Sequence, residues 1–317
     1  MSQRLLDQLQ SYDKNITDLI QHSYNPVSHE TIKFFAFSRK ELKYIVSTYR
    51  RDSNMLISSE NRVMQNIIKN TKNEISKSIL FSLETLKTDS FIFRVQAYVS
   101  KSKTYVRKMQ KFNNEDIHEI LKESNDWIIS FQERKSEKRE SYDDELSGEI
   151  RHWISEHQED VKRAEFLELM LKLLQFKTTK ISKKPSHGDY CYWNYFKGTD
   201  NKFYVFDWEF AKESDWDFID PLTNVFVFWM DLYKQFKVGA LSAVLTSPST
   251  HLEEIVNREF ERIMRLYEIS KHDLYLFILF VYCRLYLRQE TFSKELPLFE
   301  ELSNFLAFTN KNIKKDV

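Results

Sequence analysis

The feature that most constrains the fold of this chain is a change in hydrophobic period near residue 100. Before that point, runs rich in β-branched and aromatic residues occur at 31–38, 43–50, 78–86 and 90–99, around a stretch with helical spacing at 55–69. After it, apolar residues recur with helical spacing over 114–135, 149–176 and 222–317. Strand-like runs followed by helical ones predict an α+β protein. We expect a small antiparallel sheet with one main helix, followed by a larger, mostly helical part.

Two lobes are expected from this pattern, residues 1–99 and residues 100–317, with a hinge close to the boundary. A chain of 317 residues is long enough to bury a core in each. Residues 1–22 are predicted to add a short helix. The apolar face of that helix would carry Leu5, Leu6, Leu9, Ile16 and Leu19.

Charge and cysteine content exclude several classes of protein. Lys plus Arg (47) equals Asp plus Glu (47), so no net charge favours a nucleic-acid partner or an anionic membrane. The two cysteines, Cys191 and Cys283, are too few for a disulfide framework or a cysteine-based zinc site, and a reducing cytoplasm is the expected location. The most apolar run, 274–283, has about half the length of a membrane span. We therefore expect no membrane span; the sequence carries no signal for the oligomeric state.

Two nearby stretches carry the candidate chemistry: SHGDYCYWNYF (186–196) and VFDWEF (205–210). Asp189 and Asn194 are five residues apart, and Asp207 follows a strand-like run. Phosphoryl transfer needs a carboxylate to orient and deprotonate the attacking hydroxyl, and oxygen ligands to hold Mg²⁺ on the phosphates. An asparagine supplies such a ligand without adding negative charge. These residues fit that chemistry; the alternative is a chance arrangement of polar residues in loops and strand ends.

The residues HGDYCYWN and FDWE resemble the signature of the aminoglycoside phosphotransferase and choline kinase-like family, in which HGD, four residues and Asn precede a strand ending in D-W/F-E. They are particularly similar to phosphotransferase-family proteins of bacterial surface-polysaccharide pathways. The resemblance implies a bilobal protein-kinase-like fold and transfer of the γ-phosphate of ATP or GTP to a small-molecule hydroxyl, with Mg²⁺. Gly188 stands where protein kinases usually carry arginine, which favours the small-molecule branch.

The resemblance also assigns roles to individual residues. Asp189 would be the catalytic base of a loop at 186–196, and Asn194 and Asp207 would be metal ligands, the latter at a strand end within 205–210. Supporting roles fall to His187, which would hold the loop by hydrogen bonds, to Glu209, which would be structural or face the substrate, and to Asp220, which would buttress the loop. Asp217 is a competing alignment for Asp220.

In the N-terminal lobe the resemblance holds in order but not in every residue. The family carries a phosphate-binding lysine on its third strand, paired with a glutamate of the next helix. Glu60 is well placed for that glutamate, but Ser47 stands at the lysine position and cannot supply a cation. Arg50 or Lys43 is the candidate substitute, because arginine also binds phosphate well.

Other nucleotide contacts are weakly marked. Gln96 and Tyr98 match a hinge segment that contacts adenine through backbone groups. No glycine precedes Gly148, so a glycine-rich phosphate loop is missing and residues 25–30 take its place.

The sequence leaves two other hypotheses for the function open. A pseudokinase that binds nucleotide or a partner as a scaffold is favoured by Ser47 and the missing glycine loop, and is opposed by the intact Asp189, Asn194 and Asp207. A kinase acting on a protein side chain is the weaker alternative. The favoured partners are a nucleotide and a small molecule with a hydroxyl group, such as a sugar or an amino alcohol.

Overall fold

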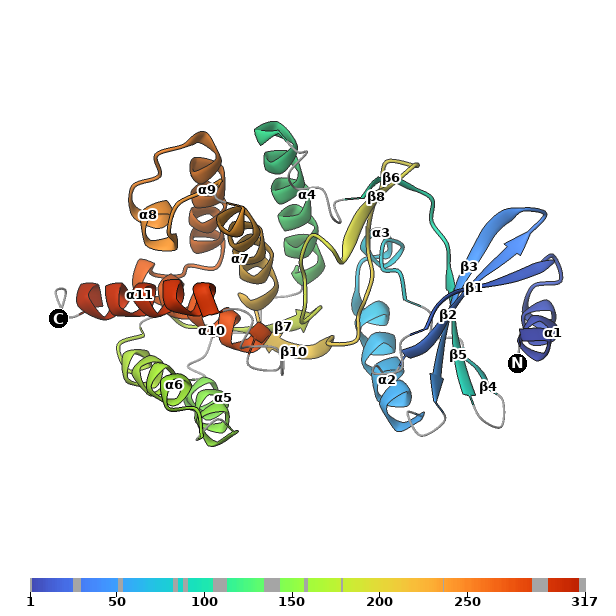
Figure 1. Cartoon of the computed structure of the whole chain (residues 1–317), viewed down its shortest axis with the longest axis horizontal. Helices are drawn as coiled ribbons and strands as arrows, with labels where there is room; N and C mark the ends of the chain where they lie inside the picture. The colour runs from blue at the N-terminus through green and yellow to red at the C-terminus, as the bar shows by residue number, and fades with distance from the viewer. Residues whose placement is uncertain are drawn as a thin grey trace. The chain divides into compact units, whose positions relative to one another are not determined.

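The computed structural model describes residues 2–24, 30–50, 54–81, 85–87, 91–104, 113–133, 143–156, 159–177, 179–235, 237–286 and 296–313. The chain divides into two compact units. Figure 1 labels their helices and strands. The first unit is Met1–Thr104 with Asn194–Glu213, and the second is Tyr105–Trp193 with Ser214–Val317. The expected fold class, with a small antiparallel sheet and a larger helical part, is confirmed.

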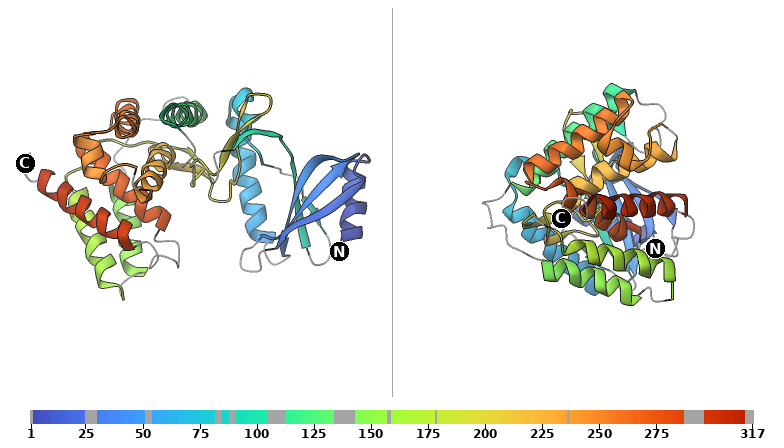
Figure 2. Two further views of the ribbon diagram at one scale, coloured as in Figure 1. Left: turned by 45° about the horizontal axis from the view of Figure 1, so that its top comes forward. Right: turned by 90° about the vertical axis from the view of Figure 1, so that its left-hand side faces the viewer.

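The first unit is built on a five-stranded antiparallel sheet of order β1-β2-β3-β5-β4. Its strands are β1 (Asp18–Tyr24), β2 (Glu30–Ser38), β3 (Glu41–Arg50), β4 (Thr85–Lys87) and β5 (Phe91–Ala97), and its helices are α1 (Ser2–Tyr12), α2 (Asn54–Asn70) and α3 (Asn73–Ser76). Figures 1 and 2 show α1 and α2 on opposite sides of this sheet. Because side chains alternate along a strand, one face packs on α1. That core contains Leu5, Leu9, Phe34, Ala36, Val46, Phe93 and Val95.

The helix predicted over residues 1–22 is wrong in its second half. The helix ends at Tyr12, and β1 follows. Ile16 and Leu19 still pack into the core with Leu5 and Leu9, as their apolar character requires. Leu19 does so from a strand because β1 pairs with the otherwise free edge of β2, where Leu19 lies opposite Ala36. Ile16 lies in the connection between α1 and β1.

A smaller three-stranded sheet completes the first unit, in the order β6-β8-β9. These strands are β6 (Lys101–Thr104), β8 (Tyr195–Gly198) and β9 (Phe203–Val205). The strand predicted at 78–86 is wrong over 78–81, where Ile79 makes only an isolated bridge to Val205. Residues 82–84 lie outside the described residues, and β4 begins at Thr85. The backbone of 78–80 bonds to Val205 instead, with Val205 N–H donating to Ser78 and Leu80 N–H donating to Val205.

The second unit is mostly helical. It contains α4 (Asn114–Gln132), α5 (Asp143–Glu156), α6 (Val161–Leu174), α7 (Ile219–Lys234), α8 (Leu241–Thr246), α9 (His251–Leu266), α10 (Lys271–Tyr286) and α11 (Leu296–Ile313). It also contains β7 (Lys183–Ser186), which pairs with β10 (Lys212–Trp216); β10 enters this unit at Ser214. Helix α7 packs against α4, α9 and α10 (Figure 1), and every residue from Ile219 to Met230 is buried.

Two predictions about the helical part have clear outcomes. The stretch with helical spacing at 149–176 contains parts of two helices, α5 and α6. Asp160 caps the N-terminus of α6 by accepting a hydrogen bond from Arg163 N–H. The apolar run 274–283 lies in α10 and is buried, as expected. Among the described residues, no helix combines the length and apolarity that crossing a membrane requires.

Candidate active site

The predicted catalytic loop begins in the second unit, where β7 ends at Ser186. Gly188 has a φ of 82°, a left-handed conformation that glycine adopts without steric cost. The Asp220 carboxylate, in the first turn of α7, accepts hydrogen bonds from His187 N–H (2.6 Å) and Gly188 N–H (2.9 Å). Asp217 instead accepts hydrogen bonds from Ser182. The geometry therefore favours Asp220 over Asp217 as the support beneath the loop.

Asp189 follows this anchored turn and is partly buried. Its N–H donates to Nδ1 of the buried His187 at 3.3 Å, a hydrogen bond within the loop. On the other side, the buried Tyr190 donates from its hydroxyl to the carbonyl of Ser124 on α4 at 2.8 Å, and its ring stacks on Trp127. Asp189 therefore lies between two residues that are fixed to the helical core.

Asp220 is fully buried, and burial raises the pKa of its carboxyl to about 7. The hydrogen bonds from His187 and Gly188 act in the opposite direction, toward a lower pKa. The negative charge of Asp215 adds to the increase in pKa, and the positive charge of Arg284 opposes it. The loop is therefore held by a group that titrates close to neutral pH.

Replacing Asp220 with asparagine tests this titration. In the unfolded chain the carboxyl has its ordinary pKa of 3.8, so between about pH 4 and 7 the folded state keeps a proton that the unfolded state releases. The stability from this proton is complete below pH 4 and is lost as the pH rises through 7. We expect the free energy of unfolding of the wild type, minus that of Asp220→Asn, to fall by about 1.4 kcal/mol per pH unit across this window.

Urea unfolding at a series of pH values measures this difference. The control is Asp144→Asn, which removes an exposed carboxyl of α5 and should give a curve parallel to that of the wild type. Parallel curves for Asp220→Asn and the wild type would show that Asp220 is ionised throughout.

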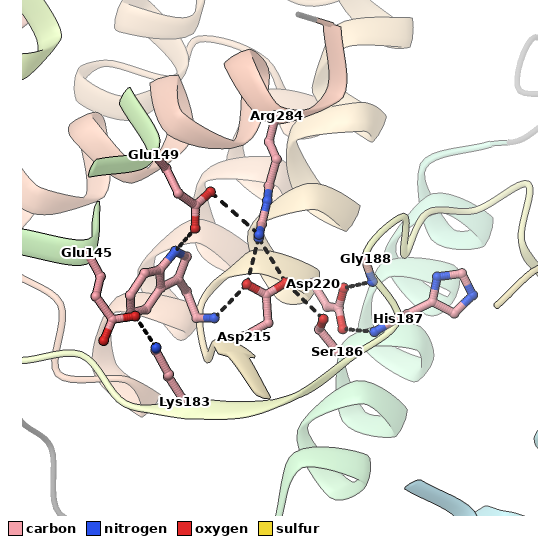
Figure 3. A network of polar contacts seen from close by, with 10 residues as sticks. Glu145, Glu149, Lys183, Ser186, His187, Gly188, Asp215, Asp220 and Arg284 are labelled. Carbon is pink, nitrogen blue, oxygen red and sulfur yellow. Dashed lines mark hydrogen bonds and ion pairs between the residues drawn. The ribbon is translucent and has the colours of Figure 1, made fainter. Parts of the chain in front are cut away.

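A buried ionic network that was not predicted from the sequence supports Ser186, the first residue of the predicted loop (Figure 3). Arg284, from α10, contacts both carboxylate oxygens of Asp215 on β10, at 2.8 and 2.9 Å. Ser186 donates its hydroxyl to the same carboxylate at 2.9 Å. Glu149 of α5 lies 3.6 Å from Arg284 and accepts a hydrogen bond from the Trp216 indole. The one signal in the sequence is an arginine that directly follows the apolar run 274–283.

The predicted metal ligands lie in the first unit. Asn194 is buried, and its backbone carbonyl accepts a hydrogen bond from Phe206 N–H at 2.9 Å. This bond joins the backbone of Asn194 to the residue before Asp207. Asp207 is exposed and has a φ of 65°. A positive φ is uncommon outside glycine, and aspartate is among the few residues that tolerate it. Buried Trp208 fixes this bend by donating its indole N–H to the Val205 carbonyl.

The chemistry of this donor pair suits Mg²⁺. Asn194 offers an amide oxygen and Asp207 a carboxylate, the hard oxygen ligands that Mg²⁺ prefers. Glu209 lies two residues beyond Asp207 and is exposed. Within the described ranges, no group of three or more His, Cys, Asp and Glu side chains is arranged to hold a metal ion. Mg²⁺ in nucleotide sites commonly takes one or two protein ligands and completes its shell with phosphates and water.

Glu60 of α2 does pair with a cation, but the cation is Arg94 of β5. Nη2 of Arg94 lies 2.8 Å from Oε2 of Glu60, and both side chains are largely buried. Two other cations were predicted from the sequence to replace the lysine. Lys43 pairs with Glu41, and the side chain of Arg50 lies outside the described residues. Arg94 lies directly opposite Ser47 in the β3–β5 register, so the charge comes from the neighbouring strand.

The predicted hinge residues make contacts within the first unit. The side-chain amide of Gln96 donates to the Leu80 carbonyl at 3.1 Å, and Tyr98 N–H donates to the Lys43 carbonyl at 2.8 Å. Residues 25–29, at the place of the expected phosphate loop, lie outside the described residues.

The fold as a whole resembles solved phosphotransferases. Searches with protein-family models and against curated protein sequences gave no match. Choline kinase LicA from Streptococcus pneumoniae is similar over 99% of this chain and 98% of its own, with 13% identity and a TM-score of 0.53. A thermostable mutant of aminoglycoside phosphotransferase APH(4)-Ia is similar over 98% of this chain and 99% of its own, with 13% identity and a TM-score of 0.55. APH(2")-IIa, in its complex with gentamicin, is similar over 98% of this chain and 96% of its own, with 14% identity and a TM-score of 0.52. The chain has the fold of these kinases along its whole length.

Proposed function

We propose that this protein is a phosphotransferase that moves the γ-phosphate of ATP or GTP to a hydroxyl group of a small molecule, such as a sugar or an amino alcohol. The observation that carries the proposal is the set Asp189, Asn194 and Asp207, in the HGD-x4-N and DWE contexts, on a chain with this fold. Among the similar structures, one of LicA contains AMP, and one of APH(4)-Ia contains ADP and hygromycin B.

In this proposal Asp189 orients the acceptor hydroxyl and takes its proton. A base of this kind must be held in position, since most of the catalysis of phosphoryl transfer comes from positioning and electrostatics. The contacts of His187 and Asp220 with the backbone on either side of Gly188 supply that support.

Asn194 and Asp207 would hold Mg²⁺, and Glu209 beside them would face the substrate or support the strand end. A bound Mg²⁺ would offset the repulsion between the phosphates and the carboxylates. The nucleotide would extend along the first unit, with its base near Gln96 and Tyr98 and its phosphates on the side of Glu60 and Ser47. We keep Arg50 as a further candidate for a phosphate contact.

Thermal unfolding with nucleotide and metal tests the proposal. We expect ATP or GTP with Mg²⁺ to raise the melting temperature of the wild type more than the nucleotide alone, because a ligand that binds only the folded state stabilises it by mass action. In Asp207→Ala the additional stabilisation by Mg²⁺ should disappear. The control is Asp200→Ala, an exposed aspartate in the turn between β8 and β9, which should respond like the wild type.

The outcomes separate the two candidate functions. Stabilisation that needs Mg²⁺ and Asp207 supports the enzyme. Stabilisation by nucleotide with no effect of Mg²⁺ or of Asp207 would contradict the proposal and favour a nucleotide-binding scaffold. A lack of stabilisation by either nucleotide would contradict it as well.

A further inference from the structure

The first unit contains a buried arginine whose hydrogen bonds are incomplete. Arg94, in the middle of β5, is only 9% exposed. Its Nη2 contacts Glu60 (2.8 Å) and Asn61 (3.2 Å) on α2. Among the described residues, its buried Nε has no hydrogen-bond partner. A guanidinium carries five N–H donors, and leaving a buried donor unpaired is costly. The site therefore lacks an acceptor that an anionic ligand could supply.

The guanidinium of Arg94 is also held in one place. It lies 4.5 Å from the ring centre of Phe81 and 5.3 Å from that of Tyr49, in addition to its contact with Glu60. A planar group restrained on both its face and its edge loses little freedom when a ligand binds. Arginine presents its donors as a fork that matches phosphate oxygens. Arg94 is therefore preorganised for an oxyanion.

A row of cross-strand neighbours places this arginine on a cationic face. Lys33 lies opposite Ser47, and Ser47 lies opposite Arg94. Residues directly opposite in a sheet share a face, so Lys33 and Arg94 flank the uncharged serine on the same side. Lys33 is exposed.

Within the same unit, hydrogen bonds connect the strand of Arg94 to the segment before Asp207. Gln96 shares the face of Arg94, two residues along β5, and donates to the Leu80 carbonyl. Leu80 N–H donates to the Val205 carbonyl at 2.7 Å, and Asp207 follows Val205 by two residues. One short segment thus joins the strand of the arginine to the strand end of the proposed metal ligand.

We propose that Arg94 of β5, opposite Ser47, is the cation that binds the nucleotide phosphates. It donates from Nε and Nη1 while Glu60 holds Nη2, and Lys33 adds a second, solvent-exposed charge. This inference rests on the phosphotransferase proposed above, because it takes the polyphosphate of that reaction's nucleotide as the ligand.

Calorimetric titration with three probes tests it: MgATP, inorganic tripolyphosphate and adenosine. The main variant is Arg94→Gln with Glu60→Gln, which removes both charges and so leaves no buried ion unpaired. We expect its affinity for MgATP and for tripolyphosphate to fall by about 10- to 100-fold, the range for a lost hydrogen bond to a charged group. Affinity for adenosine should not change. Arg62→Gln, which removes an exposed arginine of the same helix as Glu60, is the matched control and should bind all three like the wild type.

Arg94→Lys is a second variant that keeps a charge beside Glu60 but loses the fork. It should bind the two phosphate ligands about 3- to 10-fold more weakly than the wild type. Equal affinities of the wild type and the double variant for both phosphate ligands would overturn the inference, as would a wild type that binds neither. If tripolyphosphate binding depends on Arg94 while no phosphate transfer occurs, the inference stands and the proposed function fails.

Discussion

Replacing Asp189 with asparagine is expected to lower the rate of phosphate transfer by about 10²- to 10⁴-fold while leaving the affinity for nucleotide within about twofold of the wild type. The amide has the shape of the carboxylate but cannot accept the proton of the acceptor hydroxyl. The neighbouring anchors, His187 N–H and Gly188 N–H on Asp220, do not involve the Asp189 side chain. The loop should therefore keep its conformation, and the loss should appear in the rate of the chemical step.

Two measurements on the same protein make this test specific. ADP release from ATP, in the presence of a panel of sugars, amino alcohols and aminoglycosides, gives the rate, and calorimetric titration with MgATP gives the affinity. Asp144→Asn, on the exposed surface of α5, should match the wild type in both. If Asp189→Asn retained more than a tenth of the wild-type rate, Asp189 would not be the base. A parallel loss of MgATP affinity would instead assign it to nucleotide or metal binding.

The contrast between Asp189 and Arg94 shows what the sequence can reveal about this site. Asp189, Asn194 and Asp207 lie in short contiguous motifs, where spacing along the chain carries the information. Arg94 is 34 residues from Glu60 and reaches it only because β5 pairs with β3. A pairing register between strands that are distant in sequence depends on the whole sheet, so position along the chain pointed to Ser47 instead of its neighbour across the strand.

The fold shows the same limit at its edges. Long periodic stretches such as 55–69 and 114–135 were predictable as helices because each has an apolar stripe of its own. Residues 18–24 were not predictable as a strand, since Leu19 has helical spacing relative to Leu9 and Ile16. The edge of β2 decides their conformation. Likewise, nothing local distinguishes Asp215, Asp217 and Asp220, which the structure assigns to three different partners: Arg284, Ser182 and the loop backbone.

The buried ion pair below the loop leads to the second large effect. Replacing Arg284 with methionine is expected to lower the free energy of unfolding by about 3–5 kcal/mol, because the Asp215 carboxylate would remain buried without its cation. Asp215 is 4% exposed, so water cannot replace the guanidinium without opening the packing between α10 and β10. Arg265→Met, at an exposed position of α9, is the matched control and should stay within about 0.5 kcal/mol of the wild type.

The double variant Arg284→Met with Asp215→Asn separates the charge from the packing. Asparagine keeps an acceptor for the Ser186 hydroxyl and carries no charge, so more than half of the lost stability should return. Urea unfolding of the four proteins gives the comparison. A double variant no more stable than Arg284→Met would mean that the arginine acts through the contact of its guanidinium with the Phe280 ring. Recovery would instead show that the helical core must neutralise Asp215 in order to hold Ser186, the residue from which the catalytic loop starts.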